Sequence, residues 1–146
     1  MQLDKALAWL LMTAACGLAA CKTTEKPTFS VYEALPGTWG WRNDNRAGCD
    51  SNPHVITFSE DRTEMILTFA KLDEPITGET TTWRFKVLGD KPHLRVLRED
   101  EKTRNPATGR PVIREVIMIT PDRYCRRRTD RVYGSCGWHV VRCKSD

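Results

Sequence analysis

Five arginines lie within nine residues near the end of the chain: Arg123, Arg126, Arg127, Arg128 and Arg131. Guanidinium groups form paired hydrogen bonds with carboxylates and phosphates, so this cluster is suited to holding an anion. In an extended strand, Arg126 and Arg128 would point to one face and Arg127 to the other. These three are therefore candidate anion-binding residues, for lipid headgroups, lipopolysaccharide phosphates or an acidic protein partner. The commoner alternative is a solvated strand whose arginines pair with acids on neighbouring strands.

Other side chains with catalytic chemistry lack partners at a recognised spacing. His54, His93 and His139 have no serine or cysteine at a nucleophile–base spacing, and glycine-rich phosphate loops are absent. The carboxylates at 73–74 and 99–101 fall in expected loops, where such runs are usually solvated. The cysteines form no C-x-x-C pair, and the histidines supply no zinc-ligand spacing. We therefore expect a non-enzyme that binds no metal and no cofactor.

The first twenty residues are typical of a bacterial export signal. A polar start at 1–5 precedes fifteen uncharged residues at 6–20, which are too few to span a membrane and match a signal-peptide core. The run ends in Leu18-Ala19-Ala20-Cys21, which resembles a lipobox, where the cysteine thiol accepts a diacylglyceryl group. Cys16 is a weaker acceptor, because Thr13 stands where a branched aliphatic residue is expected. An ordinary secretory signal followed by a chance cysteine is the remaining alternative.

This resemblance implies a lipid-anchored protein. Residues 1–20 would be removed, Cys21 would be lipidated, and residues 21–35 would tether a domain at 36–146. Lys22, rather than aspartate, follows the cysteine, which implies the outer membrane with the protein facing the periplasm. Several acyl chains anchor a protein far more firmly than one. Nucleic acid is not expected as a partner despite the net charge of +4, because that compartment lacks it.

Composition and pattern predict a single all-β domain. Of 146 residues, 40% are hydrophobic and 29% are charged, which excludes a polytopic membrane protein and argues against disorder. Apolar and polar residues alternate along most of the chain, and turn residues separate the runs. We expect eight strands without a long helix: 38–42, 55–58, 63–69, 81–88, 93–98, 111–120, 124–129 and 138–143. Eight antiparallel strands in meander order can close into an up-and-down barrel, and a two-sheet sandwich is the alternative.

The strands at 81–88 and 93–98 carry an apolar stripe, and a stripe of this kind can line a ligand pocket. More often such a stripe is simply core. The long links at 70–79 and 99–110 would lie at barrel ends, where loops can gate a mouth or contact a partner. The candidate ligand-binding residues of the stripe are Trp83, Phe85, Val87, Leu94 and Val96.

The four remaining cysteines predict two disulfides, with three possible connectivities. Within a barrel, a last hairpin centred near Gly134 would place Cys125 opposite Cys143. Cys136 and Cys143 cannot pair within one extended strand. Barrel closure would bring the start of the last strand, at Cys136, beside the end of the first, near Cys49. We therefore predict Cys49–Cys136, which would staple the seam, and Cys125–Cys143.

The segment Leu35-Pro36-Gly37-Thr38-Trp39 resembles the Gly-x-Trp opening of lipocalin-like barrels, with residues 32–35 as the helical turn that leads into it. The resemblance implies an eight-stranded lipocalin-like barrel that Trp39 closes at one end, with a basic side chain of the last strand packed on the indole. Arg142 is the candidate. The same opening, followed by Cys49, is also similar to barrel-type inhibitors of secreted metalloproteases, which occur as periplasmic or lipid-anchored proteins.

These observations favour a monomeric, non-enzymatic envelope lipoprotein that binds a small apolar or amphipathic, anionic ligand. The first alternative is an inhibitor or immunity protein against a protease or cell-wall enzyme, with a filled barrel and its function in an exposed loop or the N-terminal segment. Lysozyme fits poorly as a target, because it is basic and this protein is too. The second alternative is a structural protein whose arginines hold anionic lipid or cell-wall polymer.

Overall fold

The computed structural model describes residues 29–43, 46–72, 77–131 and 136–144 of the chain. The signal segment 1–20, the lipobox cysteine Cys21, its rival Cys16 and most of the tether lie outside the described residues. In chain order the elements are α1 (Val31–Ala34), β1 (Gly37–Asn43), β2 (Arg46–Ala47), α2 (Gly48–Ser51), β3 (His54–Phe58), β4 (Glu64–Phe69), β5 (Thr82–Gly89), β6 (Leu94–Arg98), β7 (Arg114–Thr120), β8 (Arg123–Arg128) and β9 (Trp138–Arg142).

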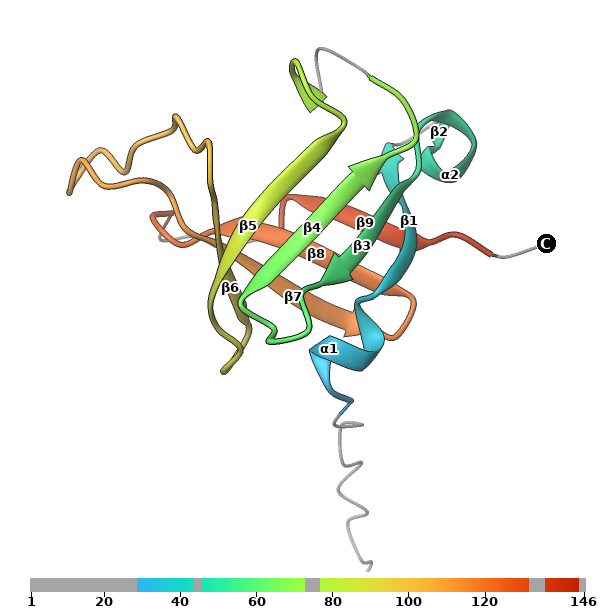
Figure 1. The fold of residues 1–146 in the computed structure, drawn as a ribbon, viewed down its shortest axis with the longest axis horizontal. Coiled ribbons are helices and arrows are strands. Elements are labelled where there is room, and N and C mark those ends of the chain that lie inside the picture. The colour runs from blue at the N-terminus through green and yellow to red at the C-terminus, as the bar shows by residue number, and fades with distance from the viewer. Residues whose placement is uncertain (1–28, 44–45, 73–76, 132–135, 145–146) are drawn as a thin grey trace, which may run out of the picture.

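Eight strands form one closed antiparallel barrel (Figure 1). β3 to β8 each pair with the strand that follows in sequence, and β1 pairs with both β3 and β9, which closes the barrel. In the β1–β9 pair, Trp39 lies opposite Arg142 and Trp41 opposite Val140. Closure leaves no exposed edge along these strands. The barrel and its eight strands, predicted from alternation and turn residues, are confirmed. β2 was not anticipated, because two residues that pair only with the end of β1 carry no alternation of their own.

The hairpin between β3 and β4 shows how local sequence sets the register. The Asp61 carboxylate accepts hydrogen bonds from the Ser59 hydroxyl at 2.6 Å and from the Thr63 backbone nitrogen at 3.1 Å. Such side-chain bonds within a turn stabilise it locally. The register that follows places His54 opposite Phe69 at the far end of the two strands.

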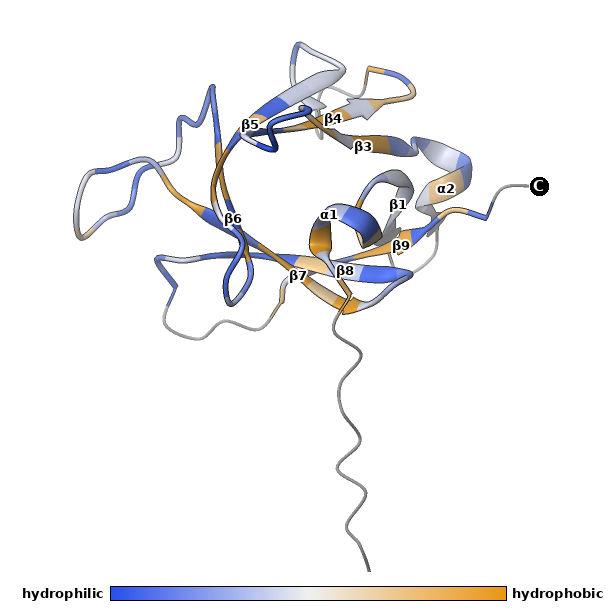
Figure 2. Ribbon diagram, turned by 60° about the horizontal axis from the view of Figure 1, so that its bottom comes forward, coloured by the Kyte–Doolittle hydropathy of each residue, from blue (hydrophilic) through white to orange (hydrophobic). Residues whose placement is uncertain are grey.

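Side chains of the barrel interior form the hydrophobic core. Trp39 and Tyr124 are among the largest fully buried side chains, and their rings meet edge to face with centroids 4.9 Å apart. α1 lies across one end of the barrel (Figure 2), and the Leu35 that follows it is fully buried. The Trp39 indole nitrogen donates to the Leu35 carbonyl at 2.8 Å, which ties the core to this covering turn. Within the described residues, neither helix approaches the length or apolar character that crossing a bilayer requires.

The disulfides join Cys49 to Cys143 and Cys125 to Cys136, so both predicted pairs, Cys49–Cys136 and Cys125–Cys143, are wrong. The first error is the position of the last hairpin. The register places Cys125 opposite His139, and β9 begins two residues after Cys136. Cys136 therefore lies before β9 and outside the β8–β9 ladder. From there it bonds to Cys125, and the two Cα atoms are 5.5 Å apart.

The second error is the path of the chain after β1. β2 turns back on β1, and α2 then packs so closely that a Cβ atom at Gly40 would lie 2.3 Å from the Cys49 nitrogen. Cys143 lies beside the same strand, since its nitrogen donates to the Thr38 carbonyl at 2.9 Å. The Cys49–Cys143 bridge therefore spans the closure between β1 and β9. A disulfide from Cys49 does cross the closure of the barrel, as predicted, but its partner is Cys143 and not Cys136.

Candidate anion-binding site

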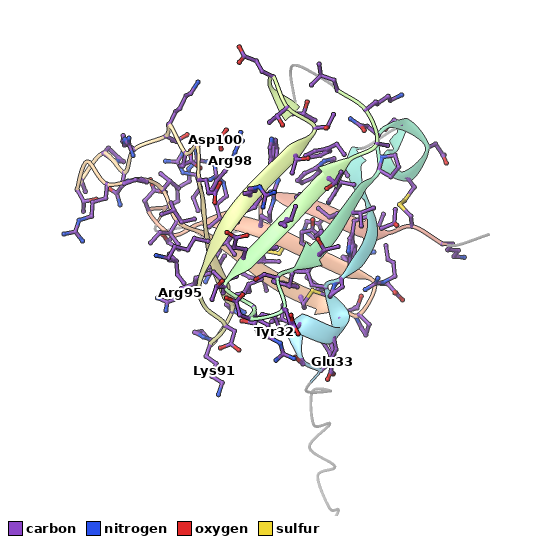
Figure 3. The ribbon with its side chains drawn as sticks, in the orientation of Figure 1. Tyr32, Glu33, Lys91, Arg95, Arg98 and Asp100 are labelled. Carbon is purple, nitrogen blue, oxygen red and sulfur yellow. A yellow bond between two sulfur atoms is a disulfide. The ribbon has the colours of Figure 1, made fainter. Side chains whose placement is uncertain are left out.

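Among the side chains that the structure describes, four arginines lie on the inner face of the barrel end opposite α1. This end, called the arginine end below, is formed where β6 and β8 finish and β7 begins. Figure 3 shows Arg98 there, at the opposite end from Tyr32 of α1. Long-range closure of the barrel produces this group, because its members come from three separate strands. They are Arg98, Arg114, Arg126 and Arg128.

Alternation along β8 divides the predicted arginines as expected. Arg126 and Arg128 follow the buried Tyr124 on the inner face, whereas Arg127 lies on the outer face with its Nε 2.5 Å from Glu115 Oε2. Arg127 therefore forms an ion pair with an acid on the neighbouring strand. For this arginine, the alternative to an anion-binding role is the one observed. Arg131 is exposed beyond the end of β8.

Three of the four inner arginines are paired with carboxylates. Arg98 Nη2 lies 2.6 Å from Asp100 Oδ2, and Figure 3 shows the two side by side. Arg128 Nη2 lies 2.6 Å from Asp130 Oδ2, so each acid follows its arginine by two residues. The third pair joins Arg114 to Glu101, whose side chain is only 5% exposed.

Arg126 is the exception. It makes no salt bridge with any carboxylate of the described residues. Its guanidinium carbon lies 4.4 Å from the centroid of the Trp41 ring and 5.7 Å from that of Trp83. Arg98 also stacks on Trp83, with its guanidinium carbon 4.4 Å from the ring centroid. Cation–π contacts of this kind hold a guanidinium in place and leave its N–H edges available.

The electrostatics of this end follow from crowding of like charges. Burial lowers the pKa of Arg126, and the charge of Arg98 lowers it further. Burial likewise lowers the pKa of Arg114 to about 10, with further contributions from Arg126, Arg98 and Arg128. Guanidinium groups are cations in proteins, so like charges repel one another at the arginine end, and an added anion would offset this repulsion.

His54 also lies at this end of the barrel, in contact with Trp41, and this position was not predicted from the sequence. The side chain is fully buried, and its ring lies 5.2 Å from the Trp41 ring and 5.3 Å from the Phe69 ring. Its Nε2 is 3.0 Å from the Tyr124 hydroxyl, while its Nδ1 has no hydrogen-bond partner among the described residues. Burial, with the charge of Arg126, lowers the pKa of His54 to about 3, so the imidazole is neutral. Burial raises the pKa of Tyr124, which keeps the phenol protonated.

Of the predicted ligand-lining residues, only Trp83 has its ring in contact with guanidinium groups of the arginine end. Phe85, Leu94 and Val96 are at most 1% exposed and belong to the core, and Val87 packs against that core. Trp83 is held in place because its indole nitrogen donates to the Thr77 carbonyl at 2.9 Å. The indoles that contact the inner arginines are therefore Trp83, which was predicted, and Trp41, which was not.

Arg142 serves the other end of the barrel. Its guanidinium carbon lies 4.2 Å from the Trp39 ring centroid, which is the packing expected for these two residues. It also donates hydrogen bonds to the carbonyls of Ala34, Pro36 and Pro121, so one side chain ties α1, the start of β1 and the β7–β8 turn together.

A groove of about 510 Å³ lies outside the barrel, between the β4–β5 surface and the loop at 99–113. Its lining carries both signs of charge, including Glu64, Lys86, Glu99 and Arg104. Arg98 and Glu101 also line the groove, so it borders the arginine end. Its charges of both signs balance and give no net attraction for an anion.

Comparison with known proteins finds no match. No family model fits the chain, and neither a characterised protein nor a solved structure matches it. Among the described residues, no three side chains of histidine, cysteine, aspartate or glutamate come together as a metal site would require. Function is therefore inferred from the geometry of the arginine end.

Proposed function

We propose that this protein is a non-enzymatic binding module that holds a small amphipathic anion at the arginine end of its barrel. The observation that carries the proposal is Arg126, a cation inside the barrel with no carboxylate partner among the described residues. A partly desolvated charge without a counter-charge is unfavourable, so an anion bound there gains more than it would at the solvated surface. Trp41 and Trp83 offer apolar surface for the rest of such a ligand.

The proposal includes an address in the bacterial envelope. Lipidation of Cys21 after removal of residues 1–20 would anchor the chain in the outer membrane, facing the periplasm. This part is supported by the lipobox resemblance, and labelling with a radioactive fatty acid tests it: wild type should incorporate label and Cys21→Ala should not. The Gly37-to-Trp39 opening and the contact of Trp39 with Arg142 support a lipocalin-like relationship.

Such an anchor would orient the site. The chain enters the barrel through α1, which covers the end opposite the arginines (Figure 2). A tether from Cys21 would therefore hold the α1 end towards the membrane and present the arginine end to the periplasm. This orientation favours a diffusible ligand over the lipid headgroups of the anchoring leaflet, and so disfavours a purely structural role.

The test is recovery of the natural ligand. The lipidated protein is purified from the envelope, and small molecules released from it are identified by mass spectrometry, for wild type, Arg126→Gln and Arg127→Gln. We expect an anionic molecule with wild type and with Arg127→Gln, whose arginine lies outside the barrel, and its loss with Arg126→Gln. Equal recovery from all three proteins would contradict the site. The melting temperature of Arg126→Gln should stay close to that of wild type, because the lost contacts with Trp41 and Trp83 are offset by removal of a partly desolvated charge that has no carboxylate partner among the described residues.

A second candidate, an inhibitor of an envelope or secreted hydrolase, is favoured by the loop between β6 and β7. This loop stands away from the barrel (Figure 1) and is ordered by its own hydrogen bonds. Asn105 Oδ1 accepts from the Ala107 nitrogen at 2.8 Å, and the Asn105 nitrogen donates to the Arg110 carbonyl at 2.8 Å. A preformed loop loses little entropy on docking. Deleting 104–110 should abolish inhibition if this function holds, and should leave anion binding intact.

A further inference from the structure

Among the described residues, the charged groups on the inner face of the arginine end have one positive charge that no carboxylate balances. Arg98, Arg114 and Arg128 are each balanced by a carboxylate from a neighbouring loop. Arg126 is not, and His54 is neutral, so this set of groups carries an excess of one positive charge. A ligand with a single charge would neutralise it. A dianion would leave an excess negative charge in the same partly desolvated space, which is unfavourable.

The His54–Tyr124 contact fixes where the imidazole proton lies. Tyr124 is 1% exposed, and within the described residues the His54 Nε2 is the partner of its hydroxyl. A buried hydroxyl that donates to nothing is costly, so the phenol proton belongs in this bond and Nε2 is its acceptor. A neutral imidazole whose Nε2 accepts carries its own proton on Nδ1. His54 therefore presents Nδ1–H as a donor.

Within the part of the chain that the structure describes, that donor lacks a partner. His54 is fully buried and its Nδ1 has no hydrogen bond there, whereas buried polar groups in proteins are nearly always bonded to protein, water or ligand. The same Trp41 ring is contacted by the His54 imidazole and by the Arg126 guanidinium. Two independent observations thus involve groups that contact one indole: within the described residues, Arg126 has no carboxylate partner and His54 Nδ1 has no hydrogen bond.

From these contacts we infer that the ligand is a monocarboxylate whose oxygens are held by the Arg126 guanidinium and the Nδ1–H of His54, with its apolar part against Trp41 and Trp83. A planar carboxylate matches the guanidinium fork, and its second oxygen remains free for a further donor. This inference rests on the proposed function and names its ligand class and a second binding residue. Tyr124 is a positioning residue, since it acts on the ligand only by setting the tautomer of His54.

The probe for the test is 3-phenylpropionate, which carries one carboxylate and one apolar ring. Mature lipidated protein, labelled with 15N in its histidine rings and held in phosphatidylcholine nanodiscs, is titrated and followed by NMR. His54 is assigned by its absence in His54→Phe. We expect a protonated Nδ1 and an acceptor-type Nε2 before addition, and a downfield shift of the Nδ1 proton when the probe binds.

Affinity supplies the second readout. Removing a hydrogen bond to a charged group should weaken binding of the probe about tenfold or more in His54→Phe. The same change at His93, outside the cluster, should leave the affinity unchanged. Binding that depends on Arg126 but leaves the Nδ1 signal and the His54→Phe affinity unaltered would overturn this inference and keep the proposed function. Tighter binding of sulfate, a dianion, than of the probe would overturn the single-charge assignment, and no binding of either anion would overturn both.

Discussion

The His54 imidazole and the Tyr124 hydroxyl meet at 3.0 Å inside the barrel, which joins β3 to β8 across 70 residues of sequence. Both groups are uncharged, because burial lowers the pKa of His54 to about 3 and raises that of Tyr124. The pair thus places a neutral hydrogen bond beneath the arginines, where a second cation would repel Arg126. This arrangement connects the acid stability of the fold to the chemistry of the arginine end.

Stability should fall as the pH is lowered from about 6.5 towards 3. In the unfolded chain His54 titrates near its ordinary pKa of about 6.5, whereas in the folded protein its pKa is about 3. Between these values the unfolded state binds the extra proton, so acid favours unfolding. The contribution is roughly 1.4 kcal/mol for each pH unit, or about 3 kcal/mol between pH 6.5 and pH 4.

Urea unfolding at pH 7 and pH 4.5 measures this effect in wild type, His54→Phe and His93→Phe. We expect His54→Phe to be less stable at pH 7, since the Tyr124 hydroxyl loses its partner, but to lose less stability on acidification. His93→Phe should retain the wild-type pH dependence. The same acid-induced loss in all three proteins would show that His54 is not the group responsible.

Replacing Arg142 should loosen the α1 end. Its guanidinium stacks on Trp39 and donates to backbone carbonyls on both sides of the barrel closure. We expect Arg142→Ala to cost about 2–3 kcal/mol in free energy of unfolding, and Arg142→Lys to recover only part, because lysine lacks the planar fork. Arg84→Ala, which breaks the exposed pair with Glu64, should cost less than about 1 kcal/mol. Equal losses at the two positions would contradict the role assigned to Arg142.

Adding a methyl group at Gly40 should prevent normal closure. A Cβ atom there would lie 2.3 Å from the Cys49 nitrogen, and backbone cannot yield as a flexible side chain does. We expect Gly40→Ala to lose at least about 3 kcal/mol and to leave Cys49 and Cys143 as free thiols, counted with a thiol reagent. Gly137→Ala is the matched control, since a Cβ atom at Gly137 meets nothing within 4 Å.

The two disulfides should differ in their contribution. Peptide mapping without reduction is expected to recover Cys49 linked to Cys143 and Cys125 linked to Cys136. The first bridge spans 94 residues and the second 11, so the chain-entropy model gives about 4–5 kcal/mol for the first and about 3 kcal/mol for the second. Serine replacements in pairs, followed by urea unfolding, measure both. A peptide linking Cys49 to Cys136 would contradict the structure.

The barrel could be predicted because its signals are local. Alternation places Trp83 and Phe85 on one face of β5, and turn residues such as those at 59–62 separate the strands. The disulfide pairing could not be predicted, since it depends on two long-range features of the structure. One is the register of the last hairpin, and the other is the return of Cys49 to β1, which requires close backbone packing at Gly40.

The candidate site was predictable only in part. Alternation alone assigns Arg126 and Arg128 to one face of β8, but Arg98 and Arg114 join them only through closure of the barrel. The sequence did contain an indication that His54 is buried, because alternation places it on the same face of β3 as the apolar Ile56. A polar residue on an apolar face indicates either a satisfied core group or a site, and the structure places this one against Trp41.

The most direct test of anion binding at the arginine end is a calorimetric titration of the lipidated protein with 3-phenylpropionate. Wild type and Arg127→Gln, with its substitution on the outer face of β8, should bind with the same affinity. Arg126→Gln should bind at least about tenfold more weakly, because the ligand loses its charged hydrogen bonds. Equal affinity of Arg126→Gln and Arg127→Gln for the carboxylate would contradict the site.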